Sequence, residues 1–213
     1  MMNNVSVVPR PAATLILLRD SAGGVEVLMV RRAQLAEFAG GAYVFPGGAL
    51  DHEDQDEVLA RLCSGLDDAS ASARLGMPQG GLGYWTAAVR ESYEEVGVLM
   101  AYDTAGRLVT IGEHNESHYD AARRAIAAGT VTLQEFVRAE NLTLAADQLH
   151  YFSHWITQAG RPRRYDTRFF IARAPAKQRP SHDGSELVDH LWIAPAEALA
   201  RNRRGEFNLL SPL

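Results

Sequence analysis

Residues 90–98 read Arg-Glu-Ser-Tyr-Glu-Glu-Val-Gly-Val, and this segment says more about fold and chemistry than any other part of the chain. Three acidic residues fall in it at spacings of three and four, which are Glu91, Glu94 and Glu95. Residues at these spacings lie on one face of an α-helix. We therefore predict a helix over Thr86–Val96 that presents three neighbouring carboxylates.

The other faces of this predicted helix fit a buried position. Val89, Tyr93 and Val96 form an apolar stripe at helical spacing. Thr86 is the expected N-cap, and Gly97 stands where helices commonly end in a left-handed residue. The segment is thus expected to be a core helix with one acidic face.

Three clustered carboxylates repel one another unless cations compensate their charge. Hard divalent ions such as Mg²⁺ prefer oxygen ligands, and they are usually completed by water and substrate phosphate. A Glu-x-x-Glu-Glu pattern alone is typical of a solvated helix face. Here it follows Phe45-Pro46-Gly47-Gly48, where proline ends a predicted strand and two glycines permit unusual backbone angles. The combination favours a metal site over a solvated face.

Taken together, these residues resemble the Nudix box, the signature of the Nudix hydrolase superfamily. The family pattern is Gly-x5-Glu-x7-Arg-Glu-U-x-Glu-Glu-x-Gly-U, where U is aliphatic. The positions of this chain that match it are Gly48, Arg90, Glu91, Glu94, Glu95, Gly97 and Val98, with an acidic residue, Asp54, at the position of the first Glu.

The chain departs from the pattern in three ways. Asp54 replaces the first Glu, unless Glu53 serves one position early, and Ser92 occupies an aliphatic position. The spacer between Asp54 and Arg90 has 35 residues instead of seven, an insertion of 28. An interrupted box of this kind resembles the peroxisomal coenzyme A diphosphatase branch and its bacterial relatives. Segments 27–32, 41–48, 153–157 and 164–170 resemble that branch too, so the resemblance spans roughly residues 12 to 200.

The resemblance implies an α/β (α+β) fold, an α/β/α sandwich with a mixed central sheet. It also implies Mg²⁺- or Mn²⁺-dependent hydrolysis of the diphosphate linkage in a nucleoside diphosphate joined to another moiety. Carried over by position, the metal ligands are the side chains of Glu91, Glu94 and Glu95 and the carbonyl of Gly47. Arg90 would pair with an acidic loop residue, for which Asp54 is the candidate, and orient the helix.

The general base is the role that transfers least well within this family. Glu186 and Asp183, just before a predicted strand, are candidates beside the carboxylates of the box, and an exposed loop position is the alternative for Glu186.

Candidate substrate contacts lie outside the acidic helix. His154 is read either as part of a pocket for a base or acyl group or as a core histidine. Arg164, Arg168 and Arg32 are read as phosphate contacts or as solvated strand ends, because arginine matches phosphate geometry. Phe45 and Gly48 complete the candidate set; they belong to residues 45–48, which we call the glycine loop. Glu37 stands where a coenzyme A motif of the family has arginine, which argues against that mode of recognition.

The rest of the chain reads as one Nudix domain over residues 1–213 with an insertion at about 55–83. In the insertion we expect a short helix at Glu57–Leu62 and otherwise a loop that either covers the site or mediates contacts of a homodimer. The remaining predicted strands are Ala13–Arg19, Val25–Val30, Tyr43–Phe45, His150–Thr157, Thr167–Ala172 and Leu187–Ile193. The remaining predicted helices are Ala121–Ala128, Leu133–Glu140 and Pro195–Arg203.

Composition narrows the functional class. The net charge of −5 argues against general nucleic-acid binding, and no apolar run is long enough to span a membrane. The single cysteine, Cys63, excludes an intramolecular disulfide and fits a cytoplasmic protein. We expect a small-molecule diphosphate as the partner. The alternative is a catalytically weak or inactive nucleotide-ligand-binding protein on the same scaffold. An isomerase of the isopentenyl diphosphate type would need a reactive cysteine, and Cys63 lies inside the insertion.

Overall fold

The computed structural model describes residues 7–34, 40–182 and 187–210, and a seven-stranded mixed sheet forms its centre. β1 (Arg10–Ser21) is antiparallel to β2 (Gly24–Arg32) and parallel to β8 (Tyr165–Arg173). β7 (His150–Ile156) continues the sheet beyond β8, and β9 (Leu187–Ile193) lies along the other side of β2. The mixed sheet expected from the sequence is therefore confirmed.

Two short strands fill the gap where β1 and β2 separate. β3 (Tyr43–Val44) pairs with β2, and β4 (Gly47–Ala49) pairs with β1. The sequence predicted one strand ending before Pro46, and β4 was not predicted. The two glycines of the box are the first residues of β4, where they pair with Thr14 and Ala13 of β1.

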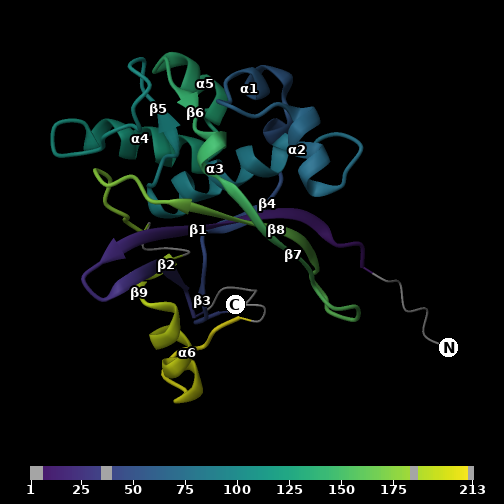
Figure 1. Cartoon of the computed structure of the whole chain (residues 1–213), viewed down its shortest axis with the longest axis vertical. Helices are drawn as coiled ribbons and strands as arrows, with labels where there is room; N and C mark the ends of the chain where they lie inside the picture. Colours follow the sequence, from purple (N-terminus) through teal and green to yellow (C-terminus); the bar gives the residue numbers. More distant parts are fainter. Residues whose placement is uncertain (1–6, 35–39, 183–186, 211–213) are drawn as a thin grey trace.

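Helices cover both faces of the sheet, as Figure 1 shows. α3 (Leu82–Val96) lies on one face together with α1 (Glu57–Arg61), α2 (Asp68–Leu75), α4 (Glu116–Ala127) and α5 (Leu133–Ala139). α6 (Pro195–Arg203) lies on the other face. Strand alternation sends Leu15 and Leu17 to the α3 side and Ile16 to the α6 side, so each face has its own apolar core. The expected α/β/α sandwich is confirmed.

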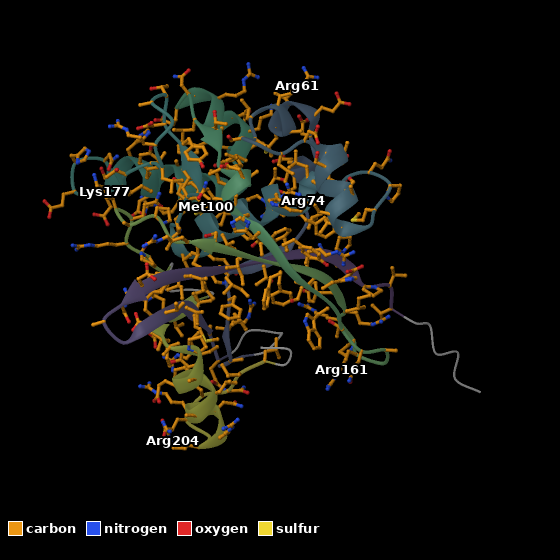
Figure 2. All side chains as sticks on the ribbon, viewed as in Figure 1. Arg61, Arg74, Met100, Arg161, Lys177 and Arg204 are labelled. Carbon is orange, nitrogen blue, oxygen red and sulfur yellow. The ribbon has the colours of Figure 1, made fainter. Side chains whose placement is uncertain are left out.

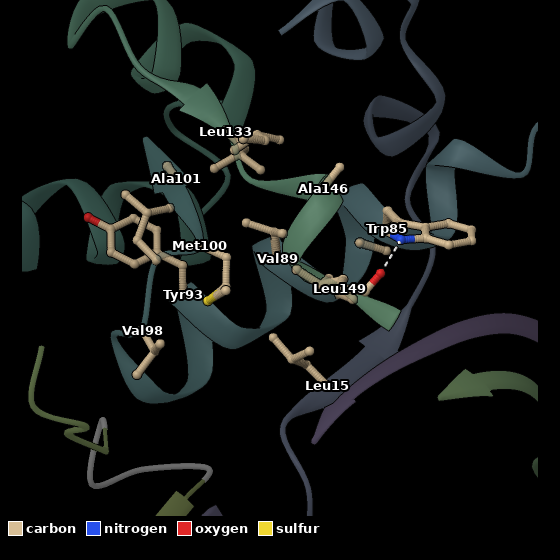
Figure 3. Close-up of a cluster of buried hydrophobic side chains, with 14 of the residues drawn as sticks. Leu15, Trp85, Val89, Tyr93, Val98, Met100, Ala101, Leu133, Ala146 and Leu149 are labelled. Atoms are coloured by element: carbon tan, nitrogen blue, oxygen red, sulfur yellow. Dashed lines mark hydrogen bonds between the residues drawn. The ribbon is translucent and has the colours of Figure 1, made fainter. Parts of the chain in front are cut away.

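α3 is the central element of the larger core. Trp85 and Tyr93 are among its largest fully buried side chains, and Trp85 Nε1 donates a hydrogen bond to the carbonyl of Leu149 at 3.0 Å (Figure 3). Burial of these side chains fixes which face of α3 remains for the carboxylates.

The start of α3 differs from the prediction by one turn. The helix begins at Leu82, because the Asp68 carboxylate accepts hydrogen bonds from the backbone N–H groups of Gly80 and Leu82 at 2.9 and 3.0 Å. Thr86 is buried inside the helix, and its hydroxyl donates to the carbonyl of Asp54 at 2.6 Å. A cap from 14 residues upstream leaves no local sign in the sequence.

The insertion is folded, whereas the sequence predicted a loop beyond its first helix. The short helix near residues 57–62 is confirmed as α1, but α2 was missed. Leu59, Leu66 and Ala71 are buried in the α3-side core. A small second sheet is formed by β5 (Ala101–Tyr102) and β6 (Thr143–Leu144). The backbone N–H of Ser64, in the insertion, donates to the carbonyl of Leu144 in this sheet at 2.8 Å. Ala71 and Ser72 are the buried residues of α2, and a Cβ atom on Gly81 would lie 2.4 Å from the backbone N of Ser72, so the glycine before α3 allows this close approach.

The remaining elements agree with the sequence apart from their ends. α4 begins five residues before the predicted start, and β8 is longer at both ends. α5 has a capping box formed by Thr132 and Glu135. Two 3₁₀ turns, His52–Gln55 and Ala146–Gln148, precede α1 and β7. Among the described residues, no helix is both long and apolar enough to cross a membrane.

Arginine side chains labelled in Figure 2 lie on separate outer elements. Arg61 and Arg74 are on α1 and α2, Arg161 is in the turn between β7 and β8, and Arg204 follows α6.

Candidate functional site

The acidic face of α3 lies directly against the glycine loop. The backbone N–H of Gly47 donates to Glu95 Oε2 at 2.9 Å. A Cβ atom on Gly48 would fall 2.5–2.7 Å from the carboxylate atoms of Glu91, so no larger residue fits there without displacing that carboxylate. Gly48 thus allows the loop to approach the helix closely, whereas a Cβ atom on Gly47 would lie 2.4 Å from the carbonyl oxygen of Ala13 in β1.

Arg90 organises this contact from the buried side. Its Nε and Nη2 donate to the two carboxylate oxygens of Asp54 at 3.0 and 2.9 Å, and Nη2 also donates to the carbonyl of Ala49 at 2.9 Å. The side chains of Arg90 and Asp54 are 8% and 1% exposed. The predicted pairing of Arg90 with Asp54 is therefore confirmed, and it joins α3 to the turn that follows the glycine loop.

The third nitrogen of the guanidinium group faces the acidic cluster. Arg90 Nη1 donates to Oε1 of Glu91 at 2.9 Å and to Oε1 of Glu94 at 3.3 Å. Together with Asp54, two carboxylates of the cluster share one guanidinium group. Glu91 and Glu94 thus meet at the helix's own arginine, whereas Glu95 accepts from the N–H of Gly47. The joint binding of a cation by the three glutamates stays a prediction.

Burial makes the carboxylates of this cluster costly to ionise. It raises the pKa of Glu91 to about 7, with Glu94 adding to the effect and Arg90 opposing it. Burial likewise raises the pKa of Glu94, again against the influence of Arg90. A carboxylate that is costly to ionise in the folded protein is stabilised by any additional cation placed beside it.

The donor set fits a hard divalent cation, although the side chains are not yet arranged around one point. Arg90 occupies only one oxygen of Glu91 and one of Glu94, and no described residue bonds to the other oxygen of either. Across the described ranges, no three acidic, histidine or cysteine side chains already converge on an ion-sized space. A cation would therefore have to draw these carboxylates away from Nη1 of Arg90.

Ser92, the second departure from the box, lies away from the acidic face. It is fully buried, and its hydroxyl donates to the carbonyl of Val98 at 3.0 Å. The hydroxyl thus satisfies a backbone acceptor just beyond the helix, where an aliphatic side chain would only pack.

The candidate substrate contacts on β7 and β8 form a separate group. His154 and Arg168 both contact the Asp166 carboxylate, and the guanidinium carbon of Arg168 lies 5.4 Å from the centre of the Tyr84 ring. Gly48, Ala13, Arg168 and His154 follow one another in register across four strands. At about 4.8 Å per strand, Arg168 and His154 lie about 10 and about 14 Å from Gly48. They are therefore neighbours of each other but not of the carboxylates.

Two further candidates, Arg164 and Phe45, have mainly structural contacts. Arg164 donates to the backbone carbonyls of Thr157 and Val7 at 3.0 and 2.7 Å, which supports the β7–β8 hairpin. Phe45 packs against the apolar core on the α6 side, so a substrate contact is not what its position favours. Arg32 ends β2 at an irregularity in the β2–β9 pairing.

The candidate bases Glu186 and Asp183, and Glu37 of the coenzyme A comparison, lie outside the described residues.

Sequence reasoning missed Arg123, a buried residue of α4. Its guanidinium group contacts the backbone of Glu94 and Glu95. An arginine in an amphipathic helix gives no sign that it reaches another helix 28 residues away in the chain, so no sequence pattern would have identified it.

Comparison with known proteins gives consistent matches. A family model described as the NUDT19 Nudix domain matches residues 66–212, which includes α3 but begins after the glycine loop. The chain is 26% identical over 211 residues to the acyl-coenzyme A diphosphatase NUDT19 of Xenopus laevis, covering 85% of this chain and 56% of that protein. It is 28% identical over 206 residues to the putative nudix hydrolase 7 of Caenorhabditis elegans, covering 95% and 57%. The chain thus spans about half the length of these relatives.

A solved structure agrees with the whole described fold. The crystal structure of a NUDIX hydrolase from Alicyclobacillus acidocaldarius superposes with a TM-score of 0.75 at 28% identity, covering 97% of this chain and 88% of that one.

Proposed function

The chain belongs to the Nudix hydrolase family, and from that premise we propose that it hydrolyses a diphosphate linkage with the help of divalent cations held on the acidic face of α3. The observation that supports this most directly is the contact of Glu91 and Glu95 with Gly48 and Gly47. These contacts place carboxylate oxygens, the ligands that a hard divalent cation prefers, directly beside the glycine loop, and a larger residue at position 48 would displace the carboxylate of Glu91.

Glu91, Glu94 and Glu95, with the carbonyl of Gly47, would hold the cation, and Mg²⁺ is the proposed ion with Mn²⁺ as its substitute. A divalent cation bound there supplies positive charge that stabilises the leaving phosphate and lowers the pKa of the attacking water. The N–H of Gly47 holds Glu95 in place, and Arg90 holds the helix against the loop. Activation of water is assigned to a carboxylate, for which Glu186 and Asp183 remain the proposed candidates.

The two replacements in the box, Asp54 and Ser92, are compatible with catalysis. Asp54 forms two hydrogen bonds with Arg90, so the shorter side chain still meets the guanidinium group. Ser92 is buried and bonded to the backbone away from the acidic face. These contacts favour an enzyme over the alternative of an inactive ligand-binding protein, because neither replacement removes a group from the metal site.

For the substrate, we propose a nucleoside diphosphate joined to another moiety, with acyl-coenzyme A as the first class to test. The relatives named as acyl-coenzyme A diphosphatases support this order. Nucleotide sugars and dinucleotides are the other classes. Arg168 and His154, about 10 to 14 Å from the glycine loop, would reach only the distal part of an extended substrate. The single cysteine supports a reducing compartment, and we propose the cytoplasm.

The experiment is a substrate panel assayed with Mg²⁺ and with Mn²⁺, in which products are identified by mass. Coenzyme A derivatives should release a phosphopantetheine product and a nucleotide, whereas sugar nucleotides and dinucleotides should release a nucleoside monophosphate. Glu94→Gln and Glu95→Gln should each lower kcat at least a hundredfold. Glu57→Gln serves as the control, because its side chain is 90% exposed on α1.

Full activity in both variants on α3 would contradict the mechanism. Tight binding of a nucleotide diphosphate without turnover of any substrate in the panel would favour the binding protein instead.

A further inference from the structure

Arg123 of α4 is directed at the turn of α3 that bears two of the proposed metal ligands. Its Nε donates to the backbone carbonyl of Glu94 and its Nη2 to the carbonyl of Glu95, each at 2.8 Å. Its Nη1 donates to the hydroxyl of Ser181, also at 2.8 Å. Arg123 is 6% exposed, so these contacts are made out of bulk water.

These contacts complete the hydrogen bonding of the helix end. The last four carbonyls of an α-helix have no partner within the helix. In α3 the carbonyl of Tyr93 accepts from the N–H of Gly97 at 2.9 Å, and that of Val96 accepts from the N–H of Ser181 at 3.0 Å. The two that remain are those of the ligand residues, and Arg123 is the donor for both.

Gly97 is what allows Arg123 to come this close. Its φ of +69° lies in the left-handed region, and a Cβ atom there would be 3.2 Å from both Nη1 of Arg123 and the hydroxyl of Ser181. The glycine of the motif therefore serves two purposes. It ends the helix, and it leaves space for the guanidinium group.

The charge of Arg123 suits this location. Helix C-termini carry partial negative charge, which a buried cation stabilises, and hydrogen bonds from an ionised donor are stronger than neutral ones. Arginine is the fitting residue because its planar group offers five donors in a fixed geometry and stays charged. A lysine would keep the charge but could not reach both carbonyls and Ser181 in the same way.

We propose that Arg123 is a positioning residue for the metal site, one that acts through the backbone of Glu94 and Glu95. By holding two consecutive carbonyls, it fixes the direction in which both side chains leave the helix toward the glycine loop. Through Ser181 it also holds the segment that leads toward β9 at the same helix end. This inference rests on the proposed function, since it assigns Arg123 a part in cation binding.

The test compares Arg123→Gln with Arg124→Gln, the same substitution at the next residue of α4. Arg124 is the matched control, because its side chain is 72% exposed and its nearest acidic partner, Asp120, is 4.0 Å away. Mn²⁺ binding to each folded variant is measured by electron paramagnetic resonance without substrate. We expect Arg123→Gln to bind Mn²⁺ at least about tenfold more weakly, the usual scale for a residue that supports metal ligands. Arg124→Gln should match the unmodified chain.

Two further variants keep the inference testable if Arg123→Gln does not fold. Arg123→Lys keeps the charge, and Ser181→Ala removes only the link to the segment before β9. Each should weaken Mn²⁺ binding about threefold or more, while KM for substrate at saturating metal stays unchanged. In Arg123→Ala, added guanidinium ion should partly restore Mn²⁺ affinity.

Unchanged Mn²⁺ affinity in the folded Arg123 variants would overturn the inference while leaving the proposed function intact. A chain that neither binds Mn²⁺ nor hydrolyses any diphosphate would instead overturn the proposed function itself.

Discussion

Replacement of Asp54 by alanine is the most informative test of how the site is built. Asp54 accepts two of the hydrogen bonds donated by the buried guanidinium group of Arg90. Removing one partner of a buried ion pair typically costs about 3–5 kcal/mol. Because Arg90 keeps its contacts with Glu91 and Glu94, we expect the lower end, about 3 kcal/mol.

The free energy of unfolding is measured by urea titration and by thermal melting. For a chain of this size, about 3 kcal/mol corresponds to a fall of roughly 6–12 °C in Tm. The control is Glu57→Gln, which removes one partner of an ion pair whose side chains are 75% and 90% exposed, and its Tm should not change measurably.

The same variant should also change the metal requirement. Without Asp54, the carboxylates of the described residues that still pair with Arg90 are Asp51, Glu91 and Glu94, so a cation competes with a more strongly held guanidinium group. Half-maximal activity should therefore need more Mg²⁺ in Asp54→Ala. A free energy of unfolding within about 0.5 kcal/mol of the unmodified chain, together with an unchanged Mg²⁺ requirement, would refute this reasoning.

Three other predictions follow from single contacts. Gly48→Ala should lower kcat with little change in circular dichroism, because the added Cβ would lie 2.5 Å from Glu91 Oε1; unchanged kcat would contradict the close approach of the loop. Ser92→Val should destabilise the fold by about 1–3 kcal/mol in urea titration but leave kcat unchanged, because it leaves the buried carbonyl of Val98 without its donor; a large loss of kcat would place Ser92 in the site instead. Burial raises the pKa of Cys63 from 9.0 to about 12, so its thiol stays protonated in the folded chain at pH 9. Alkylation of Cys63 should then be slow until urea is added, and rapid alkylation of the folded chain would contradict this. The free energy of unfolding should fall as pH rises from 9 toward 12, because the folded state binds the proton more tightly than the unfolded state.

The sequence was most informative where chemistry and local periodicity coincide. The acidic face of α3 follows from spacings of three and four residues, and the pairing of Asp54 with Arg90 follows from the family pattern. The structure contains both. Helical periodicity is enough to predict the first, and the matched positions of the box are enough to predict the second. The contact between the carboxylates and the glycine loop likewise follows from their positions in the box.

What could not be predicted depends on contacts between distant segments. α3 starts one turn early because Asp68, far upstream, caps it. α2 was missed although its ends carry local signals, the N-cap Asp67 and the left-handed Gly76. Arg123 reaches the end of α3 from another helix, and nothing in its own neighbourhood indicates that. For the start of α3 and for Arg123, the deciding partner lies elsewhere in the sequence.

The hydrogen bonding within the acidic cluster could not be predicted from the sequence either. The spacing predicts that three glutamates share a face, but not that Arg90 would bond to two of them. A guanidinium group in the middle of an acidic cluster lowers its repulsion and competes for the same oxygens as a cation. The proposed hydrolysis therefore requires that a divalent cation displaces Arg90 from these oxygens.

Anomalous X-ray diffraction from crystals soaked in Mn²⁺ tests most directly whether a divalent cation displaces Arg90 from the glutamates. The account predicts anomalous peaks within coordination distance of Glu91, Glu94 and Glu95, with Nη1 of Arg90 withdrawn from the two carboxylates that it contacts without metal. Crystals that hold Mn²⁺ only at other places, with both of those contacts to Arg90 intact, would contradict it.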